Sequence, residues 1–212
     1  MRGAFMSWSR FISDIKYDLL VPPLGLDFVK MTPKQSKENF DWFMQKITER
    51  TMYLINRCSK DIKASPDELK FSPETLKIIW RWFLKTARME KTPNDELEQM
   101  KKQFAHLGES FINKEKFTVV TEYIIRDIGM YLGQVFTVNY KNIYWDYYTK
   151  PKNDFFVNRP QLFGFVDNNY NPPFKPTFEP IHMTGVQAAK LFDNTHKETD
   201  LYDIFMKWKE WT

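Results

Sequence analysis

The chain has 212 residues, of which 42% are hydrophobic, 27% charged and 17% aromatic, and its formal net charge is +4. These large apolar side chains argue against a disordered chain, because their burial offsets the entropy lost on folding. Acidic and basic residues alternate without a long basic run, which argues against nucleic acid as a partner.

The cysteine content and the first residues predict a cytoplasmic protein. Cys58 is the one cysteine, so neither a disulfide nor a cysteine-based zinc site forms within the chain. Ser9, Arg10, Asp14 and Lys16 interrupt the first 20 residues, which therefore differ from a secretory signal. No stretch approaches the ~18–20 apolar residues that span a bilayer, and we expect no membrane span.

Residues 1–31 form the first predicted segment. Large apolar side chains from Phe5 to Leu19 recur three and four positions apart, which places them on one face of a helix. Pro22 and Pro23 then end the pattern. We expect this amphipathic segment to dock on the core, while docking on a partner or on a membrane surface stays open.

Residues 32–138 form a predicted helical part. Thr32 and Gln35 fit a capping box, and the helix that they begin carries apolar residues at helical spacing as far as Cys58. Three further Ser-Pro or Thr-Pro signals follow. They predict a single turn near 65–68, a helix from 72 to 87 and another from 92 to 107.

The most apolar predicted helix covers residues 119–138. Gly129 and Gly133 lie four positions apart in it and therefore share one face. Each glycine costs about 1 kcal/mol of helix propensity relative to alanine. We therefore predict that both glycines admit a close neighbour, either the aromatic strand that begins near Ile143 or an earlier helix such as the one that bears Trp80.

Residues 139–183 change in character and are rich in aromatic and β-branched residues. This composition predicts short strands at 143–149, 155–158, 161–166 and 181–183. The stretch 167–180 contains four prolines and three asparagines, which predict an irregular loop. Two closing helices are expected, at 184–191 and 200–211.

Helices before residue 138 and short strands after it predict an α+β fold, because alternating βαβ units are absent. We expect the N-terminal helical part to pack with a small C-terminal antiparallel sheet and closing helices in a single domain, 1–212. Its four parts are the amphipathic segment 1–31, the helical part 32–138, the strands and loop 139–183, and the closing helices 184–212.

Two motifs resemble a recurring pattern in a family of uncharacterised bacterial proteins. One is the helix start Ser72-Pro73-Glu74-Thr75-Leu76, and the other is Ile128-Gly129-Met130-Tyr131-Leu132-Gly133-Gln134-Val135, with Trp145 on a strand shortly afterwards. The resemblance covers roughly residues 36–208, although such proteins often have Glu where Gln134 stands. It implies a fold unit and a bacterial origin, and it implies no activity.

Four polar residues are candidates for an acid–base site. Arg126 and Asp127 form a charged pair in the most apolar helix, and Glu179 and His182 flank Pro180. Structural roles are favoured for the first two, because charged residues in apolar helices more often pair within the fold. Cys58 lies on an apolar face, where burial leaves a thiol inert. We expect no metal and no cofactor.

The strongest functional hint is an aromatic hairpin. If Trp145 faces the core, then Tyr144 and Tyr148 face away from it, beside Lys150 and Lys152. Exposed tyrosines next to lysines suit a protein partner or stacked bases, unless a second helix layer covers that face. These four residues are the predicted binding residues.

The leading hypothesis is a non-catalytic, cytosolic, bacterial protein-binding module of the immunity type, or a regulatory partner of another protein. It follows from the lack of a coherent catalytic set. The alternative is an enzyme with a dispersed acid–base or metal site, and a weak nucleic-acid binder ranks third.

Overall fold

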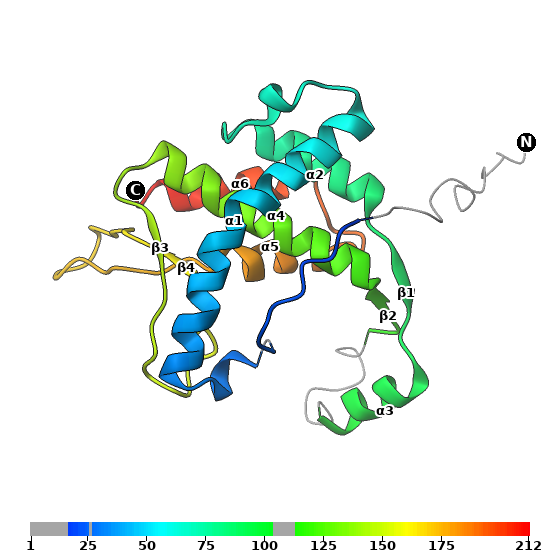
Figure 1. Cartoon of the computed structure of the whole chain (residues 1–212), viewed down its shortest axis with the longest axis horizontal. Helices are drawn as coiled ribbons and strands as arrows, with labels where there is room; N and C mark the ends of the chain where they lie inside the picture. The colour runs from blue at the N-terminus through cyan, green and yellow to red at the C-terminus, as the bar shows by residue number, and fades with distance from the viewer. Residues whose placement is uncertain (1–16, 26, 104–112) are drawn as a thin grey trace, which may run out of the picture.

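The computed structural model describes residues 17–25, 27–103 and 113–212. The described part has an α+β fold with six α-helices and two small antiparallel sheets (Figure 1). In chain order, its elements are η2 (Phe28–Lys30, a 3₁₀ helix), α1 (Pro33–Ile62), η3 (Pro66–Leu69, also 3₁₀), α2 (Thr75–Thr86), β1 (Met89–Lys91), α3 (Asn94–Gln103), β2 (Glu115–Phe117), α4 (Val119–Asn139), β3 (Tyr144–Asp146), β4 (Gln161–Phe163), α5 (Pro180–Ala189) and α6 (Asp200–Lys209).

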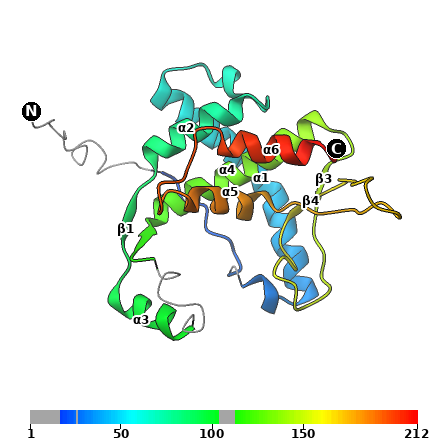
Figure 2. The same cartoon turned by 180° about the vertical axis from the view of Figure 1, so that it is seen from behind.

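Helix α4 lies at the centre of the molecule. Helix α5 packs along it, α1 crosses it, and α2 and α6 cover its other side (Figures 1 and 2). Its fully buried residues include Ile128, Tyr131, Leu132 and Phe136. A helix that contacts neighbours on several sides has an apolar surface on several sides. This position explains why the sequence of α4 is apolar around most of its circumference.

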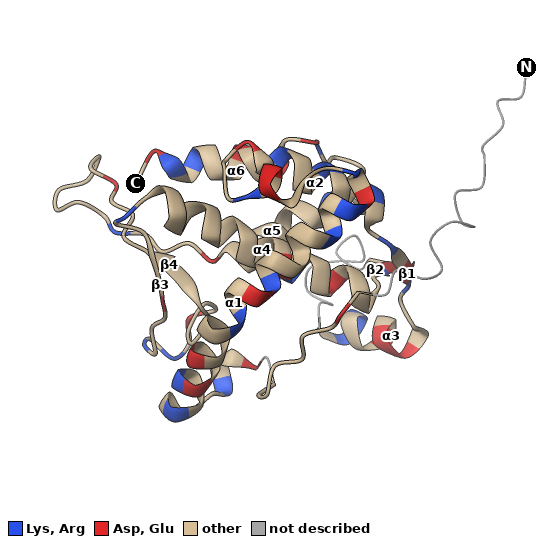
Figure 3. Cartoon of the chain, turned by 45° about the horizontal axis from the view of Figure 1, so that its top comes forward, with Lys and Arg blue, Asp and Glu red and all other residues tan. Residues whose placement is uncertain are grey.

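Local sequence signals set the start of α1. The Thr32 side chain accepts a hydrogen bond from the Gln35 backbone N–H, and the Gln35 side chain accepts one from the Thr32 N–H, which confirms the predicted capping box. Acidic and basic residues are interspersed over the exposed helix faces (Figure 3). On α1 they form ion pairs at helical spacing, such as Lys37 with Asp41.

The two sheets lie at opposite ends of the molecule (Figures 1 and 2). Strand β3 pairs with β4 in antiparallel register, with Trp145 opposite Leu162. Strands β1 and β2 form a second antiparallel pair that brackets α3 in the chain. This second pair was not predicted, because its three-residue strands are mostly exposed and lack alternating apolar positions.

The close packing predicted at the two glycines of α4 is confirmed. A Cβ on Gly133 would lie 2.6 Å from Cη2 and 2.9 Å from Cε2 of Trp145, on the expected strand. A Cβ on Gly129 would lie 2.9 Å from both N and Cγ1 of Ile181, in α5. Gly129 therefore admits the backbone of α5, which is neither of the two neighbours that the sequence predicted.

Several predicted elements are wrong in type or extent. Residues 181–183 belong to α5 and not to a strand, since α5 begins at Pro180 with Glu179 as its cap. Residues 155–158 form turns. The predicted boundary at 183/184 between strands and closing helices therefore falls inside α5, and β1 and β2 interrupt the helical part 32–138.

The predicted N-terminal helix lies mostly outside the described residues. Residues 17–20, its predicted end, are not helical. Tyr17 is nevertheless buried against the core, and its hydroxyl donates a hydrogen bond to Asp127 Oδ2 at 2.6 Å. None of the helices in the described ranges is long and apolar enough to cross a membrane.

Candidate functional site

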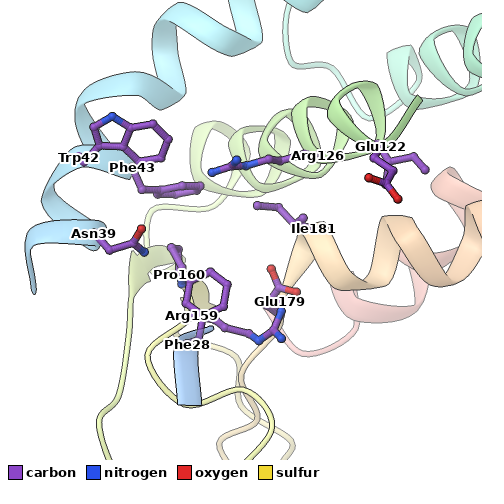
Figure 4. Close-up of a pocket in the computed structure, with 11 residues that line it drawn as sticks. Phe28, Asn39, Trp42, Phe43, Glu122, Arg126, Arg159, Pro160, Glu179 and Ile181 are labelled. Atoms are coloured by element: carbon purple, nitrogen blue, oxygen red, sulfur yellow. The ribbon is translucent and has the colours of Figure 1, made fainter. Parts of the chain in front are cut away.

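A cavity of 290 Å³ opens where α1, α4 and the first turn of α5 meet (Figure 4). Its size is close to the lower end of the range of ligand sites in proteins, roughly 300 Å³. Aromatic and aliphatic side chains make up most of the wall, and four charged side chains reach it. The lining residues are Phe28, Asn39, Trp42, Phe43, Glu122, Ile125, Arg126, Arg159, Pro160, Glu179 and Ile181.

Arg126 points from α4 into this cavity, between Phe43 and Ile181 (Figure 4). Within the described ranges its guanidinium makes neither a hydrogen bond nor an ion pair, and it lies over the face of the Trp42 ring, 5.5 Å from the centroid. Burial lowers the pKa of Arg126. The cavity therefore contains a partly desolvated cation with unused donors.

Glu122 precedes Arg126 by one helical turn and lies at the exposed edge of the cavity. This spacing allows a salt bridge, yet the two side chains diverge (Figure 4) and form none. Burial raises the pKa of Glu122 above its ordinary value. Arg126 thus forms no salt bridge with Glu122, although the neighbouring Asp127 carboxylate favours its charged form.

Arg159 forms a second part of the wall. Its Nε donates a hydrogen bond to the Phe155 carbonyl at 3.1 Å, and its guanidinium lies 4.8 Å from the Phe28 ring centroid. The preceding residue, Asn158, adopts a left-handed conformation with φ 63° and donates from Nδ2 to the Phe28 carbonyl at 2.7 Å. These contacts hold η2 against the loop and complete the wall.

Glu179 is the most buried acid of the cavity, with 5% of its surface exposed. Its carboxylate caps α5 by accepting a hydrogen bond from the His182 backbone N–H at 2.5 Å. Burial raises the pKa of Glu179 to about 7. Glu179 also lines a second, apolar cavity of 180 Å³ together with Phe156, Phe178, Met183 and Trp208.

Asp127 is adjacent to Arg126 in sequence but belongs to a different part of the structure. Its carboxylate receives hydrogen bonds from Arg50 Nη2 at 2.6 Å and from Arg50 Nε at 3.2 Å, and both side chains are buried. Arg50 also donates to the Asp18 carbonyl at 2.7 Å, and its guanidinium lies over the ring of Tyr53. This network anchors the N-terminal segment on α1 and α4.

Of the four candidate acid–base residues, Arg126 and Glu179 line the cavity. Asp127 is paired with Arg50, and the His182 ring lies 5.3 Å from the ring centroids of both Phe155 and Phe156. Burial lowers the pKa of His182. The structure therefore brings two of the four together, and catalysis by any of them stays a prediction.

The predicted binding residues of the aromatic hairpin lie elsewhere. Tyr144 is 53% exposed and stacks on Phe163 at 6.1 Å. Tyr148 is half-buried, and its hydroxyl donates a hydrogen bond to Asp154 at 2.8 Å. Lys150 and Lys152 are exposed.

The remaining chemical candidates are Cys58 and a metal site. Cys58 is fully buried, and burial raises the pKa of its thiol to about 12. No group of three His, Cys, Asp or Glu side chains comes together as a metal site in the part of the chain that the structure describes.

Sequence reasoning missed most of the cavity. Asn39, Trp42 and Phe43 lie in α1, Arg159 and Pro160 in a loop, and Phe28 in η2. An Arg-Pro pair after a turn and an aromatic pair in a helix have many uses, so neither pattern identifies a cavity wall. Only the fold brings these segments together.

A comparison of the chain with models of protein families, with curated proteins and with solved structures finds no significant match. The resemblance to uncharacterised bacterial proteins therefore stays a prediction.

Proposed function

We propose that this protein binds a small organic anion with a flat apolar body in the cavity between α1, α4 and α5. The observation that carries the proposal is the unpaired guanidinium of Arg126 in a mostly apolar cavity. A cation removed from water gains stability from an anion that replaces the lost hydration. The rings of Phe28, Trp42 and Phe43 supply apolar surface for the rest of the ligand.

A carboxylate suits Arg126 because the guanidinium fork donates two parallel hydrogen bonds to a planar acceptor. Hydrogen bonds to charged groups contribute about 1.5–3 kcal/mol each. The loss of such a contact corresponds to a decrease in affinity of roughly 10-fold to 150-fold. Arg126 is therefore the residue whose removal tests the proposal most directly.

The experiment is a calorimetric titration with benzoate, 3-phenylpropionate and indole-3-acetate. We expect at least one to bind, and Arg126→Met to weaken binding by at least about tenfold. Arg81→Met is the matched control, because Arg81 is an exposed arginine of α2 that pairs with Glu198 and does not line the cavity. Absence of binding by all three acids, or an equal effect of both substitutions, would contradict the proposal.

A second candidate function is protein binding through the hairpin, favoured by the exposed Tyr144 ring on Phe163 and by the exposed Lys150 and Lys152 farther along the same connection. Exposed aromatic rings suit a protein interface, and exposed lysines suit an acidic partner. In capture from a native lysate, Tyr144→Ser with Lys150→Glu should then remove a bound protein that the Arg126→Met variant retains. Identical capture by both variants would count against the hairpin as an interface.

A further inference from the structure

The carboxyl group of Glu179 differs in its surroundings from every other charged group of the cavity. It is almost fully buried, it caps α5, and it lines both the charged cavity and the apolar cavity behind it. Glu122, by contrast, lies at the solvent-exposed edge. A ligand that fills the cavity between α1, α4 and α5 therefore contacts Glu179.

The polar and charged groups around Glu179 come from three elements. Arg126 and Glu122 of α4 and Arg159 of the loop before β4 line the same cavity, and α5 contributes the His182 backbone N–H, which donates a hydrogen bond to the Glu179 carboxylate. The apolar cavity adds the amide of Gln161 and the hydroxyl of Thr177, which bond to each other at 2.7 Å, and no charge. Arg159 favours the ionised form of Glu179, and burial opposes it.

We infer that the cavity takes up its ligand as an anion together with one proton from solvent, and that this proton binds to the carboxylate of Glu179. The inference rests on the proposed anion-binding function. Two negative groups in one small, poorly hydrated cavity repel each other, and protonation of one removes the repulsion. The ligand anion then interacts with Arg126, while neutral Glu179 offers it a hydrogen-bond donor.

The sign of the pH dependence follows from these charges. Without ligand, the pKa of Glu179 is about 7, and a bound anion raises it further. At a pH below the pKa of the ligand-free protein, Glu179 is already protonated, and the affinity for the anion is highest. At a pH between the pKa values of Glu179 without and with ligand, one proton binds with each ligand. The affinity then falls by up to about tenfold per pH unit as the pH rises.

The test uses the full chain and benzoate, or whichever of the three aromatic acids binds most tightly. The enthalpy of binding is measured near pH 7.5 in two buffers of different ionisation enthalpy, which gives the number of protons taken up. We expect a fraction between about one half and one, and a dissociation constant that rises between about pH 6 and pH 9, where the ligand itself stays ionised.

The control is Glu179→Gln, which keeps a side-chain oxygen for the cap and cannot ionise. It should bind the acid with no proton uptake and with a dissociation constant independent of pH. Uptake that persists in Glu179→Gln would assign the proton to another group, such as His182, and overturn the inference.

Binding by the parent protein with a constant affinity from about pH 6 to pH 9 would overturn the inference without any variant, and would leave the anion-binding proposal intact. Binding of none of the three acids at any pH would overturn both.

Discussion

Alanine substitutions at the three helical glycines should change the stability of the protein in opposite directions. A Cβ on Gly185 in α5 would meet only Cγ2 of Ile125, at 4.0 Å, which is an ordinary contact. Gly185→Ala should therefore stabilise the protein by up to about 1 kcal/mol through helix propensity alone. Gly185→Ala is the control for the two glycines of α4. Those glycines also lie in a helix, but neither has room for a Cβ.

Gly133→Ala should destabilise the protein, because the new methyl group overlaps the Trp145 indole. Trp145 is only 8% exposed, and its indole packs edge-on against the Phe43 ring with 5.0 Å between the centroids, so it has little room to move. Overpacking of this kind costs about 1–3 kcal/mol. After the gain of about 1 kcal/mol in helix propensity, we expect a net loss of up to about 2 kcal/mol.

Gly129→Ala should cost more than Gly133→Ala, about 2 kcal/mol or above. Its methyl group meets the Cα and N of Ile181, and a backbone yields less readily than a side chain. Urea unfolding followed by tryptophan fluorescence measures all three variants, with a shift of roughly 0.3–1 M in the midpoint per kcal/mol. Equal midpoints for Gly129→Ala, Gly133→Ala and Gly185→Ala would refute the close-packing account.

Three further predictions concern buried polar groups. Asp127→Leu should cost about 3–5 kcal/mol in urea unfolding, because Arg50 loses its buried counterion and keeps only the exposed Asp18 carboxylate, and the double variant Arg50→Met with Asp127→Leu should recover part of the loss. The pKa of Glu179 rises from 4.5 to about 7 on folding, so the folded state binds the proton more tightly. The stability of the parent relative to Glu179→Gln should therefore fall by up to about 3 kcal/mol as the pH rises from 4.5 to about 7, and stay constant at higher pH. A stability difference that does not depend on pH would contradict this prediction. Cys58 should resist iodoacetamide in native buffer and react once urea unfolds the chain, and rapid native labelling would show that it is accessible.

The helices were predictable because their signals are local. Thr32 and Gln35 lie three positions apart and define a helix start without reference to the rest of the chain. The same holds for α4, whose apolar run predicts a helix over 119–138, close to the observed Val119–Asn139. Register and burial then follow from the helical repeat, so the core of α1, α2 and α4 could largely be read from spacing.

The start of α5 was missed although a local signal was present. Pro180 at the first helical position after an acidic cap is a recognised start pattern. The preceding Pro-rich stretch and the β-branched Ile181 favoured a loop and a strand instead. Tertiary packing on α4 decides the outcome, since α5 is short and its first turn fits against Gly129.

The cavity was beyond sequence reasoning for a different reason. Its charged residues are 122, 126, 159 and 179, and nothing in their spacing indicates that α4, a loop and α5 meet. Asp127 shows the same limit, because its partner Arg50 lies 77 positions away. Arg126 and Asp127 are neighbours in sequence, yet Arg126 lines a cavity and Asp127 belongs to an internal ion pair.

Gly129 connects the packing of the core to the geometry of the cavity. It lets the backbone of α5 approach α4 at Ile181, and Ile181 is itself part of the cavity wall. Glu179, two positions earlier, is placed by the same approach, because its carboxylate caps the helix whose first turn rests on Gly129. A larger residue at 129 would move the wall and the buried acid together, away from Arg126 on α4. The helix propensity lost at this glycine is therefore the cost of a close helix pair, and the position of the candidate site depends on that pair.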